Sequence, residues 1–241
     1  MSDKLLLIGL DGGASKINGW TIDFDSDKFG FRLGKDNIQK TYGDYPEFIK
    51  DFRSVDLAQQ LKEFSENQIR PTATEQIQAK AYTQAVIDVV REIADRYPNR
   101  KILIGIGMPG LKTSDDRGIA VLLNGPRMPE YTPTIELALR QKSINLIAPI
   151  QRIGSDADYC GIGEEYSAAG SFTSASTAYY LGGGTGAADA LKINDKLVPF
   201  DDVKPWLAKT WELQNDKGKS LERYASAGGI QSIYSDYSGI S

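Results

Sequence analysis

Residues 4–16, KLLLIGLDGGASK, are the stretch that most constrains how this chain folds. The apolar run from Leu5 to Leu10 predicts a buried strand that ends at the carboxylate of Asp11. A turn of small residues follows, and Asn18–Phe24 resumes a strand-like alternation, so the stretch predicts a hairpin. Two interpretations stay open here. The turn is either an ordinary glycine hairpin or a loop whose backbone N–H groups hold a phosphate while Asp11 holds Mg²⁺.

Composition restricts the chemistry that this chain can perform. Its 241 residues contain no histidine, which excludes Ser-His-Asp and Cys-His catalysis and every His-ligated metal site. Its single cysteine, Cys160, excludes an internal disulfide and fits a reducing cytoplasm. Any reaction must therefore use carboxylates, hydroxyls, backbone amides, lysine and a hard cation bound by oxygen.

Charge and hydropathy set the expected partners and location. The net charge of −4, with no long run of one sign, argues against a nucleic-acid partner, and no apolar run is long enough for a membrane span. We therefore expect a cytoplasmic protein with neither a nucleic acid nor a membrane as its partner. A homodimer stays open.

Between the first hairpin and residue 153 the pattern alternates between helix and strand. Periodic apolar residues predict a helix within 45–65, and a capping box at 72–75 begins a long amphipathic helix that ends near Tyr97-Pro98. Residues 29–42 carry a weak strand signal, whereas 101–106, 144–148 and 150–153 read as strands. A short helix is expected at 134–142. The predicted class is α/β.

Residues 105–110, GIGMPG, match the dinucleotide-binding pattern G-x-G-x-x-G directly after a strand. In a Rossmann fold this loop opens a helix. Here Pro109-Gly110 leads into a polar turn and then a strand at 119–123, so we predict a hairpin and discount a nucleotide at this loop.

A second carboxylate, Asp156, follows the strands at 144–153 and opens a helix expected over 157–169. Ligands of α/β proteins bind at the carboxyl ends of strands, and a carboxylate there can take a proton from an alcohol. The alternative is that Asp156 only caps its helix.

A second strand–glycine turn–strand pattern spans residues 178–193 around Gly182-Gly183-Gly184-Thr185-Gly186, with a tight turn at Asn194-Asp195. No P-loop sequence occurs in the chain. We expect a helix within 199–214 and a short one at 221–227, and none in the polar segment after Gly229.

Two glycine hairpins with an Asp-tipped strand between them resemble the actin/Hsp70/sugar-kinase superfamily, and most closely the ROK sugar kinases. Residues 9–16 resemble the family's G-x-D-x-G-G-T-K, and 104–111 its I-G-I-G-x-P-G. Residues 155–164 resemble N-D-A-N and its helix, 183–186 the second phosphate motif, 126–131 the P-N-x-P-x-W loop, and 220–230 the segment before the adenosine site.

The resemblance implies two ribonuclease-H-like (actin-like ATPase) domains, over 1–165 and 166–241, with a nucleotide cleft between them and an incomplete second domain. It implies an ATP-dependent kinase that phosphorylates a hydroxyl of a sugar, of the glucokinase or N-acetylhexosamine kinase type, with ATP and Mg²⁺. Asp156 would be the general base and Asp11 would hold Mg²⁺ through water. The remaining implied contacts are with the nucleotide phosphates (Gly12, Gly13, Ser15, Lys16, Gly184, Thr185 and Gly186) and with the sugar (Gly110, Ser155 and Asp156).

Several positions depart from the family pattern. Ala14 and Ser15 are mild changes, whereas Ser155 and Arg127 each stand where the family has an asparagine. Nothing after Lys196 resembles the G-E-x-G-H segment that supplies a Glu and a His to the sugar. The cysteine-rich zinc motif is absent, and so are the adenosine-binding glycines and the closing helix expected after residue 230. The alternative function is therefore a weakly active or inactive ROK-like protein that binds a sugar or a nucleotide.

Overall fold

The computed structural model describes residues 5–184, 186–203 and 206–239, without the side chains of Asp156, Ala157 and Asp201. The chain divides into two compact units, one made of residues 1–25 and 31–155 and the other of residues 26–30 and 156–241. Each unit is described separately below. The domains predicted over 1–165 and 166–241 stay a prediction.

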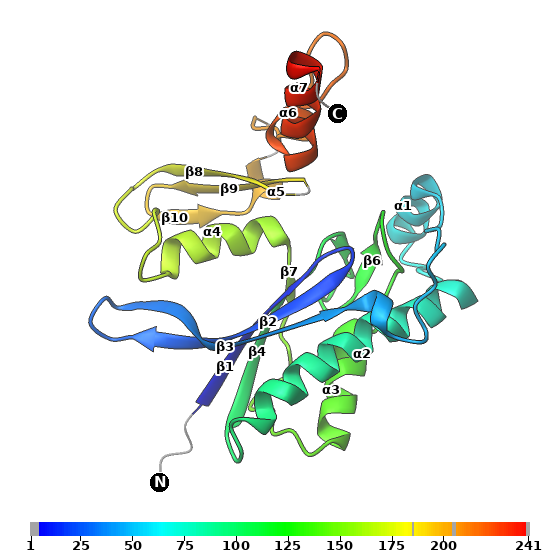
Figure 1. The fold of residues 1–241 in the computed structure, drawn as a ribbon, viewed down its shortest axis with the longest axis vertical. Coiled ribbons are helices and arrows are strands. Elements are labelled where there is room, and N and C mark those ends of the chain that lie inside the picture. The colour runs from blue at the N-terminus through cyan, green and yellow to red at the C-terminus, as the bar shows by residue number, and fades with distance from the viewer. Residues whose placement is uncertain (1–4, 185, 204–205, 240–241) are drawn as a thin grey trace. The chain divides into compact units, whose positions relative to one another are not determined.

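The first unit is built on a five-stranded mixed sheet with the strand order β3-β2-β1-β4-β7. Strand β1 pairs antiparallel with β2 and parallel with β4, and β4 pairs parallel with β7. Figure 1 shows α2 and α3 together on one side of this sheet. The elements of this unit are β1 (Leu5–Gly12), β2 (Lys16–Asp25), β3 (Gly30–Thr41), the 3₁₀ helix η1 (Tyr42–Asp44), α1 (Leu57–Ser65), α2 (Ala73–Asp95), β4 (Lys101–Gly107), β5 (Leu111–Lys112), β6 (Ile119–Val121), α3 (Tyr131–Gln141) and β7 (Ile153–Gly154).

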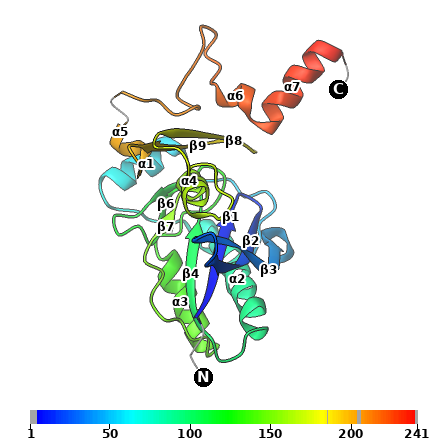
Figure 2. The ribbon, with the colours of Figure 1, turned by 90° about the vertical axis from the view of Figure 1, so that its left-hand side faces the viewer.

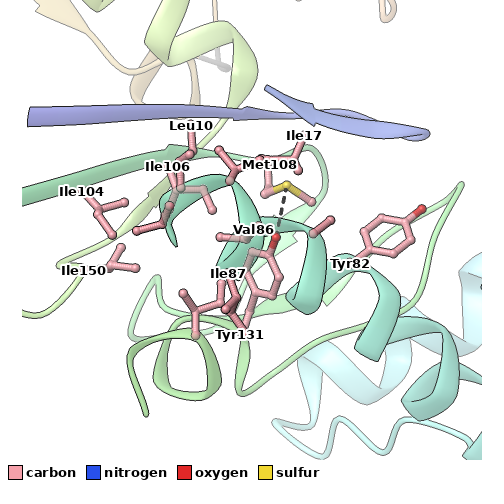
Figure 3. Close-up of a cluster of buried hydrophobic side chains, with 14 of the residues drawn as sticks. Leu10, Ile17, Tyr82, Val86, Ile87, Ile104, Ile106, Met108, Tyr131 and Ile150 are labelled. Carbon is pink, nitrogen blue, oxygen red and sulfur yellow. Dashed lines mark hydrogen bonds between the residues drawn. The ribbon is translucent and has the colours of Figure 1, made fainter. Parts of the chain in front are cut away.

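Helix α2 forms where the sequence predicts it, and its capping box is present. The Thr72 side chain accepts a hydrogen bond from the Glu75 N–H, and the Glu75 carboxylate accepts one from the Thr72 N–H. Its apolar stripe packs on the sheet: Ala85, Val89 and Ile93 are fully buried. Figure 3 shows part of the resulting core, in which α2 side chains meet residues of β1, β4 and α3.

Helix α2 also sets how closely β2 approaches it. A Cβ at Gly19 of β2 would lie 2.3 Å from Cγ1 of Val89 and 3.0 Å from Cδ2 of Leu10. A side chain there would push the sheet away from the helix, so the glycine allows the close packing of this layer.

The second unit has a small antiparallel sheet, ordered β10-β9-β8, on which α4 packs. Figure 2 shows α6 and α7 following one another at the carboxyl end of the chain. The Asn194-Asp195 turn is confirmed, with both residues at positive φ, as a tight hairpin turn requires. The elements are α4 (Asp156–Tyr166), β8 (Ala178–Gly183), β9 (Ala187–Ile193), β10 (Lys196–Val198), α5 (Phe200–Val203), α6 (Glu222–Ala225) and α7 (Ala227–Ser238).

Several expectations about local structure differ from the structure. Only 57–65 of the helix predicted within 45–65 forms, because tight turns precede it and Asp56 caps its start. Of the two strands expected at 144–148 and 150–153, the first forms only an isolated bridge to β4 (Ile102↔Leu146), and only Ile153 of the second belongs to a strand, β7. In 199–214 the helix is limited to α5 in the described residues, since Thr210 is bound to Asp189 of β9 and draws the segment into turns.

The predicted α/β class is confirmed as a mixed α/β fold with a central mixed sheet. Within the described residues, no helix is both long and apolar enough to cross a membrane.

Candidate functional site

The carboxyl ends of β1, β4 and β7 lie side by side at one edge of the first sheet. The parallel register pairs Asp11 with Gly107, and Gly107 with Gly154. Ser155 follows Gly154 directly, and Asp156 is the first residue of α4. The backbone thus brings together the predicted metal ligand, the predicted sugar-binding loop and the predicted general base, at the edge where α/β proteins bind ligands. The side chain of Asp156 lies outside the described part of the structure.

The turn after β1 is a confirmed hairpin whose backbone is fixed from several sides. The Gly13 N–H donates to the Lys16 carbonyl at 2.9 Å, and the Tyr42 N–H donates to the Ser15 carbonyl at 2.9 Å. The Tyr82 hydroxyl donates to the Ala14 carbonyl at 2.9 Å. The exposed N–H groups of Ala14 and Ser15 have no hydrogen-bond partner among the described residues. The turn therefore offers an anion the donors of Ala14 and Ser15, whereas the Gly13 N–H is already bonded.

Gly12 joins this turn to the core. A Cβ at Gly12 would lie 1.9 Å from Sδ of Met108 and 3.3 Å from the Gly107 carbonyl. Met108 is fully buried, and the Tyr131 hydroxyl contacts its sulfur at 3.8 Å, as the dashed line in Figure 3 marks. Gly12 is therefore required by the close approach of β1 to the loop after β4.

The loop after β4 is a rigid turn. Gly110 has a φ of +88°, and a Cβ there would lie 2.2 Å from the Val121 carbonyl. The Lys112 ammonium donates to the carbonyls of Met108, at 2.7 Å, and Gly110, at 2.6 Å. The loop leads into the paired strands β5 and β6, so the hairpin predicted in place of a Rossmann helix is confirmed.

Two buried tyrosines, Tyr42 and Tyr82, form hydrogen bonds with the turn after β1. Tyr42 is fully buried and stacks on Tyr82, with 3.8 Å between the ring centroids. Burial, helped by the charges of neighbouring groups that include Asp11, raises the pKa of Tyr42 far above its usual value. Burial raises the pKa of Tyr82 to about 12, so its hydroxyl stays protonated and keeps donating to the turn at neutral pH.

The second glycine hairpin belongs to the second unit. Gly183 pairs with Ala187, and the Gly184 N–H donates to the Gly186 carbonyl at 2.8 Å. Thr185 lies outside the described residues. The first residue of α7 donates its N–H to the Gly184 carbonyl at 2.8 Å, and Glu222 of α6 accepts from the Ala187 N–H at 3.1 Å. Two helices thus support this exposed loop.

Helix α7 corrects the prediction that the chain has no final helix. Its cap, Ser226, accepts from the Gly229 N–H at 3.2 Å. A Cβ at Gly229 would lie 2.0 Å from the Arg223 carbonyl, so glycine is needed where α6 turns into α7. The sequence after Ser226 lacks the Glu or Gln of a capping box, and the pair Gly228-Gly229 is more typical of a helix end than of a helix start. The available signals for this helix were the cap residue Ser226 and the helical spacing of Ile230, Tyr234 and Tyr237.

Comparison with known proteins tests the fold. No protein-family model and no curated protein sequence matches the chain. Solved structures do match: a candidate sugar kinase from Cytophaga hutchinsonii has a TM-score of 0.61 at 17% identity. The inorganic polyphosphate/ATP-glucomannokinase of an Arthrobacter species has a TM-score of 0.57 at 19% identity. A ROK family transcriptional regulator, a homolog of the E. coli MLC protein, has a TM-score of 0.57 at 11% identity.

The chain has the fold of the ROK sugar kinases. The match to the Cytophaga protein covers 98% of this chain and 62% of that protein. For the glucomannokinase the two values are 99% and 73%, and for the transcriptional regulator 97% and 50%. This chain thus spans between half and three quarters of the length of these three proteins.

Arg127, which stands in the ROK loop where the family has an asparagine, lies inside the first unit rather than at its surface. Its side chain is fully buried and forms ion pairs with Glu75 at 2.7 Å and Glu63 at 2.5 Å. A further guanidinium N–H donates to the Arg70 carbonyl at 3.1 Å. This departure from the ROK pattern is therefore structural, because the guanidinium ties the loop to α1 and α2.

The two carboxylates of this cluster have lowered pKa values. Hydrogen bonds from Gln59, from the Arg70 N–H and from Arg127 lower the pKa of Glu63 to about 2. Burial by itself would raise the pKa of Glu75, but the hydrogen bonds from Arg127 and Thr72 outweigh it and lower that pKa.

The residues at the sheet edge fit Mg²⁺ bound together with a phosphate. In the described part of the chain no group of three or more Asp, Glu or Cys side chains could hold a metal alone. Mg²⁺ normally keeps several waters and uses one or two carboxylates plus substrate phosphates. Asp11, exposed beside a turn with unpaired N–H groups, provides a ligand of that kind.

Proposed function

We propose that this chain forms the phosphoryl-transfer site of an ATP-dependent sugar kinase. One observation carries the proposal: the register of three neighbouring strands brings Asp11, the 107–110 loop and Ser155-Asp156 to one edge of the sheet. The fold, which several sugar kinases share, supports it.

In this proposal each residue has a defined task. Asp156 takes the proton from the attacking sugar hydroxyl, and Ser155 and Gly110 position the sugar. Asp11 holds Mg²⁺ through water. Mg²⁺ supplies neutralisation of the phosphate charge when it is bound.

Phosphate binding in this proposal uses backbone groups of both glycine turns. The turn from Gly12 to Lys16 provides the N–H groups of Ala14 and Ser15, the Ser15 hydroxyl and the Lys16 ammonium, which now donates to Gln39 at 3.0 Å. Gly184, Thr185 and Gly186 provide the second set of donors. Catalysis then consists mainly of positioning and of electrostatic stabilisation by fixed donors.

The second candidate function is a protein that binds a sugar or a nucleotide without turnover. Two observations favour it: the chain has no histidine for the sugar, and a ROK transcriptional regulator shares its fold. Such a protein would keep the phosphate turns without useful catalysis.

Phosphate transfer from radiolabelled ATP to a panel of hexoses and N-acetylhexosamines separates the two functions. A kinase transfers label to at least one sugar, and Asp156→Asn lowers the rate by about 10²–10⁴-fold, the usual contribution of a general base. Asp158→Asn, two residues further along the same helix, is the matched control and keeps most of the activity. Calorimetric binding of ATP-Mg²⁺ or sugar without transfer would instead establish the binding protein, and no transfer to any sugar would refute the kinase.

A further inference from the structure

A pocket of about 370 Å³ lies within the first unit, next to the tip of the β1–β2 hairpin. Its wall includes Ala14 of the hairpin turn. The other lining residues come from the segment between β3 and α1, from α2 and from the loop after β6. They are Phe48, Ile49, Lys50, Phe52, Arg53, Ser54, Gln78, Tyr82, Leu123 and Asn124.

Two hydrogen bonds tie the walls of the pocket together, one of them made by a buried side chain. The side chain of Gln78 is buried, and its carbonyl accepts from the Ile49 N–H at 2.7 Å. The Ser54 hydroxyl donates to the Leu123 carbonyl, which joins the two walls. Tyr82, which also lines the pocket, is buried, and Figure 3 shows its ring at the opposite end of the core cluster from Ile104 and Ile150. These hydrogen bonds fix the positions of the walls, as in a ligand pocket that exists before its ligand binds.

The charged side chains that line the pocket are both cations, Lys50 and Arg53. Both are exposed, and neither has a hydrogen bond or an ion pair within the described part of the chain. The acidic neighbours do not neutralise them: Asp51 is not part of the lining, and the Asp56 carboxylate caps α1 by accepting from the N–H groups of the first turn. Two unpaired cations at one rim favour an anion.

We propose that this pocket binds a small sugar-like molecule that bears one anionic group, a phosphate or a carboxylate. Lys50 and Arg53 hold the anionic group. The rings of Phe48 and Phe52 contact the body of the ligand, and Asn124 offers it hydrogen bonds. That the ligand is sugar-like rests on the proposed kinase function. That it carries an anionic group rests only on the residues that line the pocket.

Calorimetry on the full chain tests the assignment with glucose 6-phosphate, glucuronate, glucose and inorganic phosphate as probes. Lys50→Gln/Arg53→Gln removes both cations. Lys80→Gln/Lys142→Gln is the matched control, since it removes two exposed charges of the same unit that do not line the pocket. We expect the two anionic sugars to bind the wild type, and the pocket variant to bind them at least about tenfold more weakly, the loss expected when charge-assisted hydrogen bonds are removed. The control should bind like the wild type.

Other outcomes overturn the proposal. They are no binding of either anionic sugar to the wild type, equal affinity in the pocket variant, or displacement of the anionic sugar by ATP, which would make the pocket part of a nucleotide site. If inorganic phosphate binds as tightly as glucose 6-phosphate, the pocket does not recognise the sugar part of the ligand, and that part of the proposal is wrong. Because the amide signals of Ser54 and Asn124 should shift in nuclear magnetic resonance spectra of the wild type, the test does not depend on the variant folding. A chain that transfers no phosphate yet binds anionic sugars here would refute the kinase and leave this pocket standing.

Discussion

Replacing Arg127 by methionine should destabilise the first unit strongly. The guanidinium donates to Glu75, to Glu63 and to the Arg70 carbonyl from a fully buried position. Its removal leaves the Glu75 carboxylate, whose side chain is 1% exposed, without a cation. Removing one partner of a buried ion pair typically lowers the free energy of unfolding by about 3–5 kcal/mol. That is a large share of the roughly 5–15 kcal/mol by which a domain is stable.

Urea unfolding followed by far-ultraviolet circular dichroism measures this cost, and a double-mutant cycle assigns it. Glu75→Gln keeps a capping partner for Thr72 but removes the charge. Arg127→Met/Glu75→Gln should then cost less than the sum of the single changes, with a coupling of about 0.5–3 kcal/mol. Arg91→Met is the control, because its ion pair with Asp88 is half-exposed and should contribute under about 1 kcal/mol. A cost below about 1 kcal/mol for Arg127→Met, or strictly additive changes, would refute the buried-pair reasoning.

Three further predictions concern stability. Because the folded pKa of Glu63 is about 2 and that of Glu75 is also lowered from 4.5, their contribution is fully present above about pH 5 and is lost as the pH falls toward 2. An acid titration followed by circular dichroism should show this loss, and a flat stability curve between pH 5 and 3 would contradict it. Gly12→Ala should cost about 1–3 kcal/mol by overpacking, whereas Gly105→Ala, whose Cβ meets nothing within 4 Å, should cost clearly less in the same urea assay. Asp189→Ala should leave the buried N–H and hydroxyl of Thr210 unpaired and cost about 1–3 kcal/mol, with faster hydrogen exchange in the 206–214 segment. Unchanged exchange there would argue against this anchoring role.

Local signals predicted much of the fold. The capping box and the four-residue apolar spacing before Ile93 mark α2 because both depend on neighbours within one or two turns. The glycine turns likewise predicted both hairpins, since their strands are adjacent in sequence. The carboxyl-edge position of Asp11 and Asp156 followed from the strand pattern, which the register confirms for the backbone.

The features that the sequence did not predict depend on contacts between distant residues. Glu75 lies outside the apolar stripe of α2, so the local pattern indicates a surface residue. In the structure it is buried and paired with Arg127, which is distant in the sequence. The segment 45–56 has helical spacing, yet its backbone bonds to Gln78 and its turns pack on α2 instead. Neither partner is visible in a local pattern.

The most direct measurement is nuclear magnetic resonance of the ¹⁵N-labelled chain titrated with ATP-Mg²⁺, read at the amides of the first turn. If this turn receives phosphate, the Ala14 and Ser15 amide signals should move strongly, because their N–H groups are unpaired in the described structure. The Gly13 signal should move less, since its N–H already donates to Lys16. Ala14 and Ser15 signals that stay fixed at saturating ATP-Mg²⁺ would contradict the phosphate site at this edge of the sheet.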